Sequence, residues 1–301
     1  MDLSAVDFSS LKGAIHFDAP LAPLSWFRVG GPADLLFTPE DEDDLVAFLK
    51  LLPHSVPLYV IGLGSNLLVR DGGIRGAVIR LGKAFQTITI ESHHHIRAGA
   101  QAADVKVARL AAEAGIAGFS FLRGIPGTIG GALRMNGGAY GGEIKDIFVS
   151  ARGIDREGLV HKFDHASMGF SYRHTSAASD IIFTEALFKG QPGDSAKILE
   201  EMNAITDARS STQPVNTRTG GSTFRNPEGQ KAWELIDKAG LRGHRVGGAE
   251  ISKLHTNFLI AHDGATAADL EALGEEARRR VKEMTGITLE WEIKIVGEPV
   301  R

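Results

Sequence analysis

The spacing of hydrophobic and polar residues predicts where the first helix of the chain begins. From Leu45 to Leu52, apolar side chains recur at the three- and four-residue spacing of one helix face. Acidic residues 40–44 come just before this pattern and favour the positive end of a helix dipole. We expect Thr38 to cap this helix and Pro39 to occupy its first turn. The acidic run is therefore interpreted as a helix start and not as a metal site.

The same criteria divide the rest of the chain into a mixture of strands and helices. Apolar or alternating runs predict strands at residues 35–37, 58–61, 77–81, 87–90, 96–98, 147–151, 159–161, 181–188, 255–261 and 289–295. Helical spacing predicts helices at residues 103–115, 194–208, 233–239 and 266–284, with Thr266 and Asp269 as a capping pair. Residues 210–214 are expected to break the chain after the second of these helices. The pattern indicates an α+β protein.

Residues 121–142 hold eight glycines with almost no charge between them, and the rest of the chain is organised around this stretch. Glycine is costly inside regular elements, so we expect neither an ordinary helix nor an ordinary strand here. Apolar residues such as Ile125, Ile129 and Leu133 argue against a mobile linker. Closely approaching backbone amides would suit an anion such as a pyrophosphate.

A second glycine-containing loop, residues 62–67, directly follows a predicted strand. It fails the dinucleotide pattern G-x-G-x-x-G, because Leu67 stands at the last glycine position and no clear helix follows. It still offers amides and the Ser65 hydroxyl to a phosphate. A dinucleotide held between two domains would use both loops.

Composition and charge remove several classes of function. The net charge of −4 gives no basic surface for nucleic acid or anionic membrane. Absence of cysteine excludes disulfides, thiolate catalysis and cysteine metal sites. Histidines 93–95 are interpreted as a hairpin turn, since adjacent side chains of a strand point to opposite faces. No apolar run matches a membrane span, and the first ten residues lack the apolar core of a signal peptide, so we expect a cytoplasmic protein.

Four side chains outside the glycine loops are candidates for chemistry. Arg173 follows an apolar segment and suits a carboxylate, although a surface salt bridge is the commoner use of such a residue. Ser222 follows two glycines and suits a nucleophile, a phosphate ligand, a proton donor or a simple turn. Glu290 and Glu292 fall on one face of the last predicted strand, so periodicity does not separate them.

Seven short motifs, taken in order, resemble one enzyme family over about residues 26–297. They are RVGGPA at 28–33, GLGSNL at 62–67, GIPGTIGG at 124–131, MNGGAYG at 135–141, YR at 172–173, GSTFRNP at 221–227 and LEWEI at 289–293. The chain is similar in these motifs to the UDP-N-acetylenolpyruvoylglucosamine reductase family. The match in spacing and order is specific.

The resemblance implies a fold, a cofactor and the residues that hold it. It implies a two-domain FAD-binding unit of the vanillyl-alcohol-oxidase/PCMH type, residues 1–84 and 85–192, followed by an α+β substrate-binding domain, residues 193–301. FAD would be bound without a covalent link. The implied cofactor contacts are Gly62, Gly64, Ser65, Asn66, Leu67, Gly124, Ile125, Pro126, Gly127, Thr128, Gly130, Gly131, Asn136 and Gly137.

The resemblance also implies the reaction. NADPH would reduce UDP-N-acetylglucosamine enolpyruvate to UDP-N-acetylmuramate through FAD in peptidoglycan precursor synthesis, with ping-pong kinetics. Arg173 would polarise the substrate carboxylate, Ser222 would protonate C2, and Glu292, chosen over Glu290 by resemblance alone, would assist Arg173. The implied substrate contacts are Tyr172, Arg225, Asn226 and Lys253. No metal, nucleic acid, membrane insertion or obligate protein partner is implied.

The chain departs from the family pattern in three places. Leu63 replaces a more usual glycine, and Trp291 stands beside Glu292 where a small residue or proline is commoner. Residues 173–193 contain no tyrosine that could serve the extra substrate loop, so the chain resembles the shorter form of the family. Three alternatives stay open: an FAD oxidase of the same fold, a non-catalytic nucleotide-binding protein, and, remotely, a serine hydrolase, although Ser222 lacks the G-x-S-x-G motif.

Overall fold

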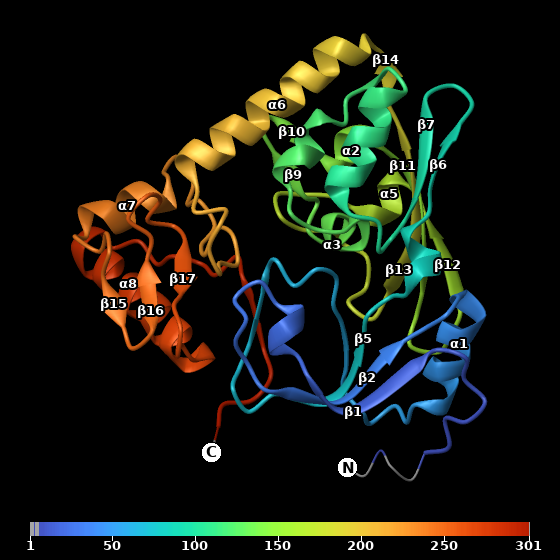
Figure 1. The fold of residues 1–301 in the computed structure, drawn as a ribbon, viewed down its shortest axis with the longest axis horizontal. Coiled ribbons are helices and arrows are strands. Elements are labelled where there is room, and N and C mark those ends of the chain that lie inside the picture. Colours follow the sequence, from blue (N-terminus) through green and yellow to red (C-terminus); the bar gives the residue numbers. More distant parts are fainter. Residues whose placement is uncertain (1–2, 4–5, 301) are drawn as a thin grey trace. The chain divides into compact units, whose positions relative to one another are not determined.

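The computed structural model describes residue 3 and residues 6–300, and this part of the chain forms two compact units (Figure 1). Unit 1 comprises Met1–His16, Leu35–Gly62 and Ala77–Ala208, and unit 2 comprises Phe17–Asp34, Leu63–Gly76 and Arg209–Arg301. Residues 1, 2, 4 and 5, which belong to the segment expected to carry no signal peptide, lie outside the described residues.

The main sheet of unit 1 is antiparallel, with the strand order β12-β11-β13-β7-β6. Its strands are β6 (Ile88–Glu91), β7 (His95–Gly99), β11 (Phe148–Ile154), β12 (Val160–Phe163) and β13 (Ile182–Lys189). Helices α2 (Asp104–Glu113) and α3 (Ile129–Arg134) lie on one side of this sheet (Figure 1). Ile96, Ala98 and Phe188 are fully buried in the core of this unit. The five strands and helix α2 confirm the sequence prediction.

A second sheet has the order β1-β2-β5-β3 and is accompanied by helix α1 (Glu42–Leu51). Its strands are β1 (Ala14–Pro20), β2 (Pro32–Thr38), β3 (Leu58–Val60) and β5 (Ile74–Ile79). The predicted cap of α1 is wrong: Asp41 is the N-cap and accepts the Asp44 amide at 2.8 Å, whereas Thr38 ends β2. β1 has no counterpart among the predicted strands.

Unit 2 combines two small sheets with two helices. Its antiparallel sheet holds β15 (Arg245–Val246), β16 (Ala249–Ile251) and β17 (Leu259–Ala261), and a parallel pair joins β4 (Leu67–Val69) to β18 (Lys294–Val296). The helices are α7 (Ala232–Lys238) and α8 (Ala267–Thr285), and α8 begins with the predicted capping pair of Thr266 and Asp269. Leu270, Leu273 and Val281 of α8 are buried in the core of this unit.

The remaining elements are short, except for one helix of 18 residues. They are the strand pairs β8 (Ile116–Ala117) with β14 (Gln191–Pro192) and β9 (Gly138–Ala139) with β10 (Gly142–Glu143), the helices α4 (Ile144–Ile147), α5 (His165–Met168) and α6 (Ser195–Thr212), and the 3-10 turns Ala22–Leu24, Lys83–Gln86 and Ser120–Gly124.

Four further expectations are wrong in part. The glycine-rich stretch does contain a helix, α3, because Thr128 caps it and its apolar residues are buried. Helix α6 continues through Thr212, so the predicted break at 210–214 comes later. The strand predicted at 255–261 is only β17, since residues 252–258 form hydrogen-bonded turns. The strand predicted at 289–295 is an isolated bridge at Trp291, a bend at Ile293 and then β18.

Candidate functional site

The glycine-rich loop of unit 1 is fixed by its own main chain. Residues 127–130 run antiparallel to residues 100–104, with a bridge between Ala103 and Thr128. The amides of Asp104, Ile129 and Gly130 donate to the carbonyls of Gly127, Ala102 and Ala100 at 3.1, 3.0 and 2.8 Å. The loop is therefore an ordered part of the fold and not a linker. Two of its amides are used inside the protein, so any anion must be met by others.

Several glycines of this region are packed too closely for a side chain. A Cβ atom at Gly62 would lie 2.6 Å from the Thr128 hydroxyl oxygen, so the first glycine loop of the sequence touches the second within unit 1. A Cβ at Gly127 would lie 2.9 Å from a carboxylate oxygen of Asp104. Real Cβ contacts are not this short. The protein's own packing therefore requires glycine at these two positions.

Asp104 is a buried acid that sequence reasoning missed. It is the first residue of α2 and is fully buried, and neither carboxylate oxygen has a hydrogen-bond partner among the described residues. Burial raises the pKa of Asp104 well above its ordinary value of 3.8, and the nearby Gly127 amide offsets only part of that shift. In the sequence, an acid at this position is indistinguishable from an ordinary helix start.

Asn136, an expected FAD contact, uses its side chain within unit 1. Its Nδ2 donates to Glu143 Oε2 at 2.9 Å and to the Ser171 carbonyl at 3.1 Å, and its Oδ1 accepts the Lys145 amide at 3.0 Å. The residue is fully buried and adopts a φ of +40°. Asn136 therefore ties the end of the glycine stretch to the segment that carries Tyr172 and Arg173.

Arg173 lies in a tight turn closed by reciprocal backbone hydrogen bonds between Ser171 and His174. It has a φ of +54°, and its guanidinium lies 5.3 Å from the centre of the Tyr172 ring, which is half exposed. A Cβ at Gly138 would come within 3.4 Å of an Arg173 nitrogen. Lys145, then Asn136, and at longer range Arg173 lower the pKa of Glu143. Glu143 is therefore ionised beside the predicted arginine.

In unit 2, the segment that carries Ser222 pairs with the segment that carries Glu292. The Glu292 amide donates to the Thr223 carbonyl at 2.8 Å. Phe224 and Trp291 form an antiparallel bridge, and their rings lie 4.9 Å apart. The structure thus brings together two of the three predicted catalytic residues, Ser222 and Glu292, on adjacent segments. Arg173 belongs to unit 1.

Asn66 fixes the other side of the Glu292 segment. Its Nδ2 donates to the Glu292 carbonyl at 3.1 Å, and its own carbonyl accepts the Lys294 amide at 3.1 Å. The parallel pairing of β4 with β18 begins at the next residue, Leu67. A Cβ at Gly64 would lie 2.2 Å from the Leu24 carbonyl oxygen, so only glycine fits there. Asn66 is expected to contact FAD, but its side-chain amide is bonded to the backbone of Glu292, a catalytic candidate.

Asn257 holds the Ser222 segment from its other edge. Its Oδ1 accepts the Phe224 amide at 2.9 Å, and its Nδ2 donates to the Phe224 carbonyl at 2.8 Å. Its backbone carbonyl accepts the Thr223 amide at 2.8 Å. Sequence reasoning missed this residue, because it placed Asn257 inside a predicted strand.

The Trp291 departure is accommodated by a glycine of α8. A Cβ at Gly274 would lie 2.0 Å from the Trp291 ring, so the indole occupies the space that this glycine leaves. Its Nε1 donates to Glu275 Oε1 at 2.8 Å. The backbone next to Glu292 is thereby fixed by a large side chain in place of a small one.

The expected substrate contacts of unit 2 differ in their surroundings. Arg225 is half-buried beside Glu290, and its Nε is a buried donor with no partner among the described residues. The side chain of Asn226 accepts the Ala232 amide at 3.0 Å, at the start of α7. Lys253 is exposed, next to Gly243. Arg225 and Lys253 therefore keep cationic groups for a diphosphate, whereas Asn226 already has a structural contact.

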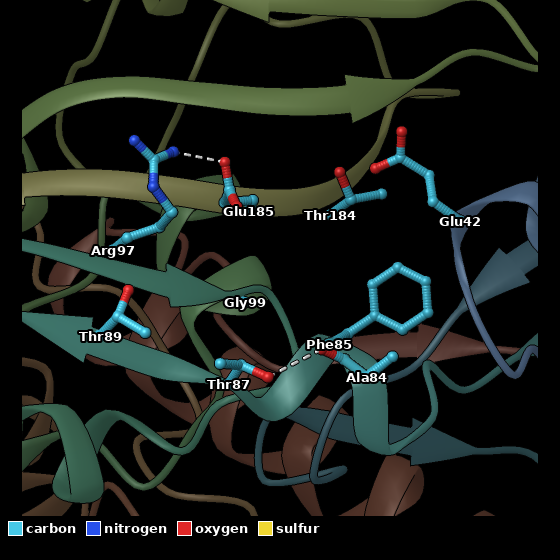
Figure 2. Close-up of a pocket in the computed structure, with 9 residues that line it drawn as sticks. All are labelled: Glu42, Ala84, Phe85, Thr87, Thr89, Arg97, Gly99, Thr184 and Glu185. Atoms are coloured by element: carbon cyan, nitrogen blue, oxygen red, sulfur yellow. Dashed lines mark hydrogen bonds and ion pairs between the residues drawn. The ribbon is translucent and has the colours of Figure 1, made fainter.

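A pocket of about 310 Å³ in unit 1 contains none of the predicted site residues (Figure 2). It is lined by Glu42, Ala84, Phe85, Thr87, Thr89, Arg97, Gly99, Thr184 and Glu185. Arg97 pairs with Glu185 at 2.5 Å and with Glu91 at 2.6 Å, so its charge is neutralised within the sheet. This pocket lies on the polar face of β7 and β13, away from the glycine loops of the sequence.

Two absences concern the described residues only. Residue 3 and residues 6–300 contain no group of three or more histidine, cysteine, aspartate or glutamate side chains arranged to hold a metal ion. None of the helices in this same part of the chain combines the length and the apolar character needed to cross a bilayer.

Comparison with known proteins assigns both halves of the chain. Residues 33–164 match the family described as FAD binding domain, and residues 213–296 match the C-terminal domain of UDP-N-acetylenolpyruvoylglucosamine reductase. A UDP-N-acetylenolpyruvoylglucosamine reductase from Parvibaculum lavamentivorans is 60% identical over 287 residues, which is 95% of this chain and 92% of the relative. One from Azorhizobium caulinodans is 58% identical over 295 residues, 98% of this chain and 96% of the relative.

Solved structures agree with these matches. The crystal structure of UDP-N-acetylenolpyruvylglucosamine reductase from Thermus caldophilus superposes with a TM-score of 0.82 at 34% identity, covering 95% of this chain and 99% of that one. A 6-hydroxy-D-nicotine oxidase from Arthrobacter nicotinovorans reaches a TM-score of 0.50 at 13% identity, covering 94% of this chain and 62% of that one, which shows a likeness of fold alone. The expected fold class is confirmed.

Proposed function

The chain belongs to the UDP-N-acetylenolpyruvoylglucosamine reductase family, and from this premise we propose how its residues divide the reaction. The enzyme is an FAD-dependent oxidoreductase that uses NADPH to reduce UDP-N-acetylglucosamine enolpyruvate to UDP-N-acetylmuramate for peptidoglycan synthesis. When bound, FAD carries hydride from NADPH to C3 of the enolpyruvyl group. The family assignment rules out the three alternatives left open by the sequence, namely an oxidase, a non-catalytic binding protein and a hydrolase.

Ser222 supplies the proton that completes the reduction. Hydride addition at C3 leaves negative charge at C2, and this charge spreads into the adjacent carboxylate as an enolate. A serine hydroxyl is a weak acid, but the carbon of an enolate is basic enough to accept its proton. The observation that carries this role is the 2.8 Å hydrogen bond from the Glu292 amide to the Thr223 carbonyl, which holds Ser222 beside Glu292.

Arg173 and Glu292 stabilise the charge that develops on the substrate. A guanidinium can bind both carboxylate oxygens at once, and its charge favours the enolate over the ground state. Such a donor in a closed site contributes on the order of 3–4 kcal/mol. The tight turn around Arg173 supports this role, because it fixes the backbone from which the side chain extends. Glu292, or a water bound to it, assists as a hydrogen-bond donor.

The cofactor and the rest of the substrate use the remaining predicted residues. Gly62, Gly124 and Gly127 are proposed to approach the FAD diphosphate through their main chain, and Thr128, which caps α3, is proposed to lie beside them. Gly130 contributes shape, since its amide is already bonded to Ala100. Arg225 and Lys253 are proposed to meet the substrate diphosphate. The reaction uses NADPH to reduce a nucleotide sugar. We propose the cytoplasm as its location.

Ser222→Ala tests the role of the proton donor. We expect reduction of bound FAD by NADPH to remain nearly intact, while reoxidation by the enolpyruvyl substrate slows by a factor of about 10² or more. Anaerobic stopped-flow absorbance of the flavin separates the two half-reactions.

Ser222→Cys is the matched control, because a thiol also carries a proton at this position. We expect it to retain more of the reoxidation rate than alanine does. Equal slowing of both half-reactions in Ser222→Ala would make Ser222 structural. An unchanged reoxidation rate would assign proton delivery to another group.

A further inference from the structure

The side-chain amide of Asn257 bonds to the backbone next to Ser222 in the way that the peptide group of a neighbouring strand would. Its side chain is 4% exposed, and its amide meets both polar groups of Phe224, the amide at 2.9 Å and the carbonyl at 2.8 Å. Its main-chain carbonyl also accepts a hydrogen bond from the Thr223 amide at 2.8 Å. One residue therefore makes three hydrogen bonds to the two residues that follow Ser222.

These contacts oppose the contacts from the Glu292 segment. The Thr223 carbonyl accepts the Glu292 amide on the side away from Asn257, so the Ser222 segment is held between the two. Asn257 is itself held, because its main-chain amide donates a hydrogen bond to His255 Nδ1 at 3.3 Å. Burial lowers the pKa of His255, which keeps this imidazole neutral and able to accept. Asn257 thus supports the segment that carries Ser222, and His255 in turn supports Asn257.

We propose that Asn257 is a positioning residue for proton delivery, which acts by holding the backbone of Thr223 and Phe224 so that the Ser222 hydroxyl is presented in one position. This inference rests on the proposed role of Ser222. A misplacement of about 1 Å in a reacting group can cost about a hundredfold in rate, so a residue that never touches the substrate can still control the step.

Asparagine suits this task for a chemical reason. Its amide is both a donor and an acceptor at the same reach, as a backbone peptide group is. Alanine offers neither, and an ionised aspartate offers acceptors only, so it would repel the Phe224 carbonyl. A protonated aspartic acid again has one donor and one acceptor.

The first experiment is a double-mutant cycle with Asn257→Ala and Ser222→Ala on the full-length enzyme with FAD bound. We expect Asn257→Ala to slow flavin reoxidation by the substrate by about tenfold to a hundredfold and to leave reduction by NADPH unchanged. In the Ser222→Ala background the same change should have no further effect, because the group that it positions is gone.

The outcomes separate this inference from the proposed function. If Ser222→Ala itself leaves reoxidation unchanged, the proton-donor role is wrong, and any slowing by Asn257→Ala overturns the inference by showing that it acts through another group. If Ser222→Ala is slow but the two effects add, Ser222 is catalytic and Asn257 is not its positioning residue.

Asn257→Asp gives a second test that does not require the alanine variant to fold. Its reoxidation rate relative to the wild type should rise as pH falls, because the protonated acid restores the lost donor. His255, Arg225 and Glu292 are the other titratable or charged groups on the segments that meet here, and the wild-type pH profile, recorded in parallel, shows their own contribution. A ratio independent of pH would overturn the inference.

Discussion

The two units hold the backbone around their candidate residues by different means. In unit 1, the loop 127–130 is held by main-chain hydrogen bonds to residues 100–104, and glycine permits the close approach. In unit 2, the segments that carry Ser222 and Glu292 are held by the side-chain amides of Asn257 and Asn66. The first arrangement depends on close contacts that a side chain would block. The second places reactive side chains and keeps them in register.

This difference predicts where each half is sensitive to substitution. A closely packed glycine is sensitive to a substitution that adds a side chain. A side-chain amide that bonds to the backbone is sensitive to a substitution that removes it. Asn136 departs from this division, because it is a side-chain clamp within unit 1, and Gly274 is a close approach within unit 2. Substitutions at these two positions and at one open glycine test the comparison.

Asn136→Ala should have the largest effect on stability. It removes three partly buried hydrogen bonds and places alanine at a φ of +40°, which disfavours a side chain without a local hydrogen bond. We expect a loss of about 3–5 kcal/mol in the free energy of unfolding, measured by urea denaturation of the flavin-free protein.

Asn136→Gly is the matched control, since it removes the same hydrogen bonds but tolerates the positive φ. It should be about 1 kcal/mol less destabilising than alanine. A loss below about 1 kcal/mol for Asn136→Ala would mean that main-chain contacts alone hold this part of unit 1.

Gly274→Ala should have an intermediate effect. The added Cβ would lie 2.0 Å from the Trp291 ring, so the indole and the backbone next to Glu292 must move. We expect a loss of about 1–3 kcal/mol in unfolding free energy, together with slower flavin reoxidation and unchanged reduction by NADPH. Adding Trp291→Leu, which removes the obstructing ring atoms, should recover part of both; a double variant as impaired as the single one would contradict this account.

Gly131→Ala should have the smallest effect and the opposite sign. Gly131 lies inside α3 and is exposed, and the nearest atom to an added Cβ is the Thr128 hydroxyl oxygen at 3.7 Å. Alanine should stabilise the flavin-free protein by about 0.5–1 kcal/mol, measured by thermal unfolding. If Gly131 approaches FAD as proposed, the same change should weaken FAD binding in a fluorescence titration, and stabilisation with unchanged FAD affinity would remove Gly131 from the cofactor site.

The sequence predicted the elements better than it predicted the contacts that place the site. Periodicity found the five strands of the main sheet in unit 1 and the α8 capping pair, because both patterns are local. Thr38 and Asp41 both suit a helix cap, and only the pairing of Thr38 in β2 decides between them. Asn66 and Asn257 contact segments far away in the chain, so no local pattern marks them as supports of Glu292 and Ser222.

The burial of Asp104 couples the folding of the glycine-rich loop of unit 1 to proton uptake. The unfolded chain binds a proton there with the ordinary pKa of 3.8, whereas the folded protein holds it to much higher pH. Between those two pKa values the native state binds more protons, so Asp104 lowers stability as pH rises. Glu143, whose pKa is lowered, acts in the other direction and loses its contribution as pH falls. Acidification therefore stabilises the fold around Asp104 while it weakens the ion pair between Glu143 and Lys145.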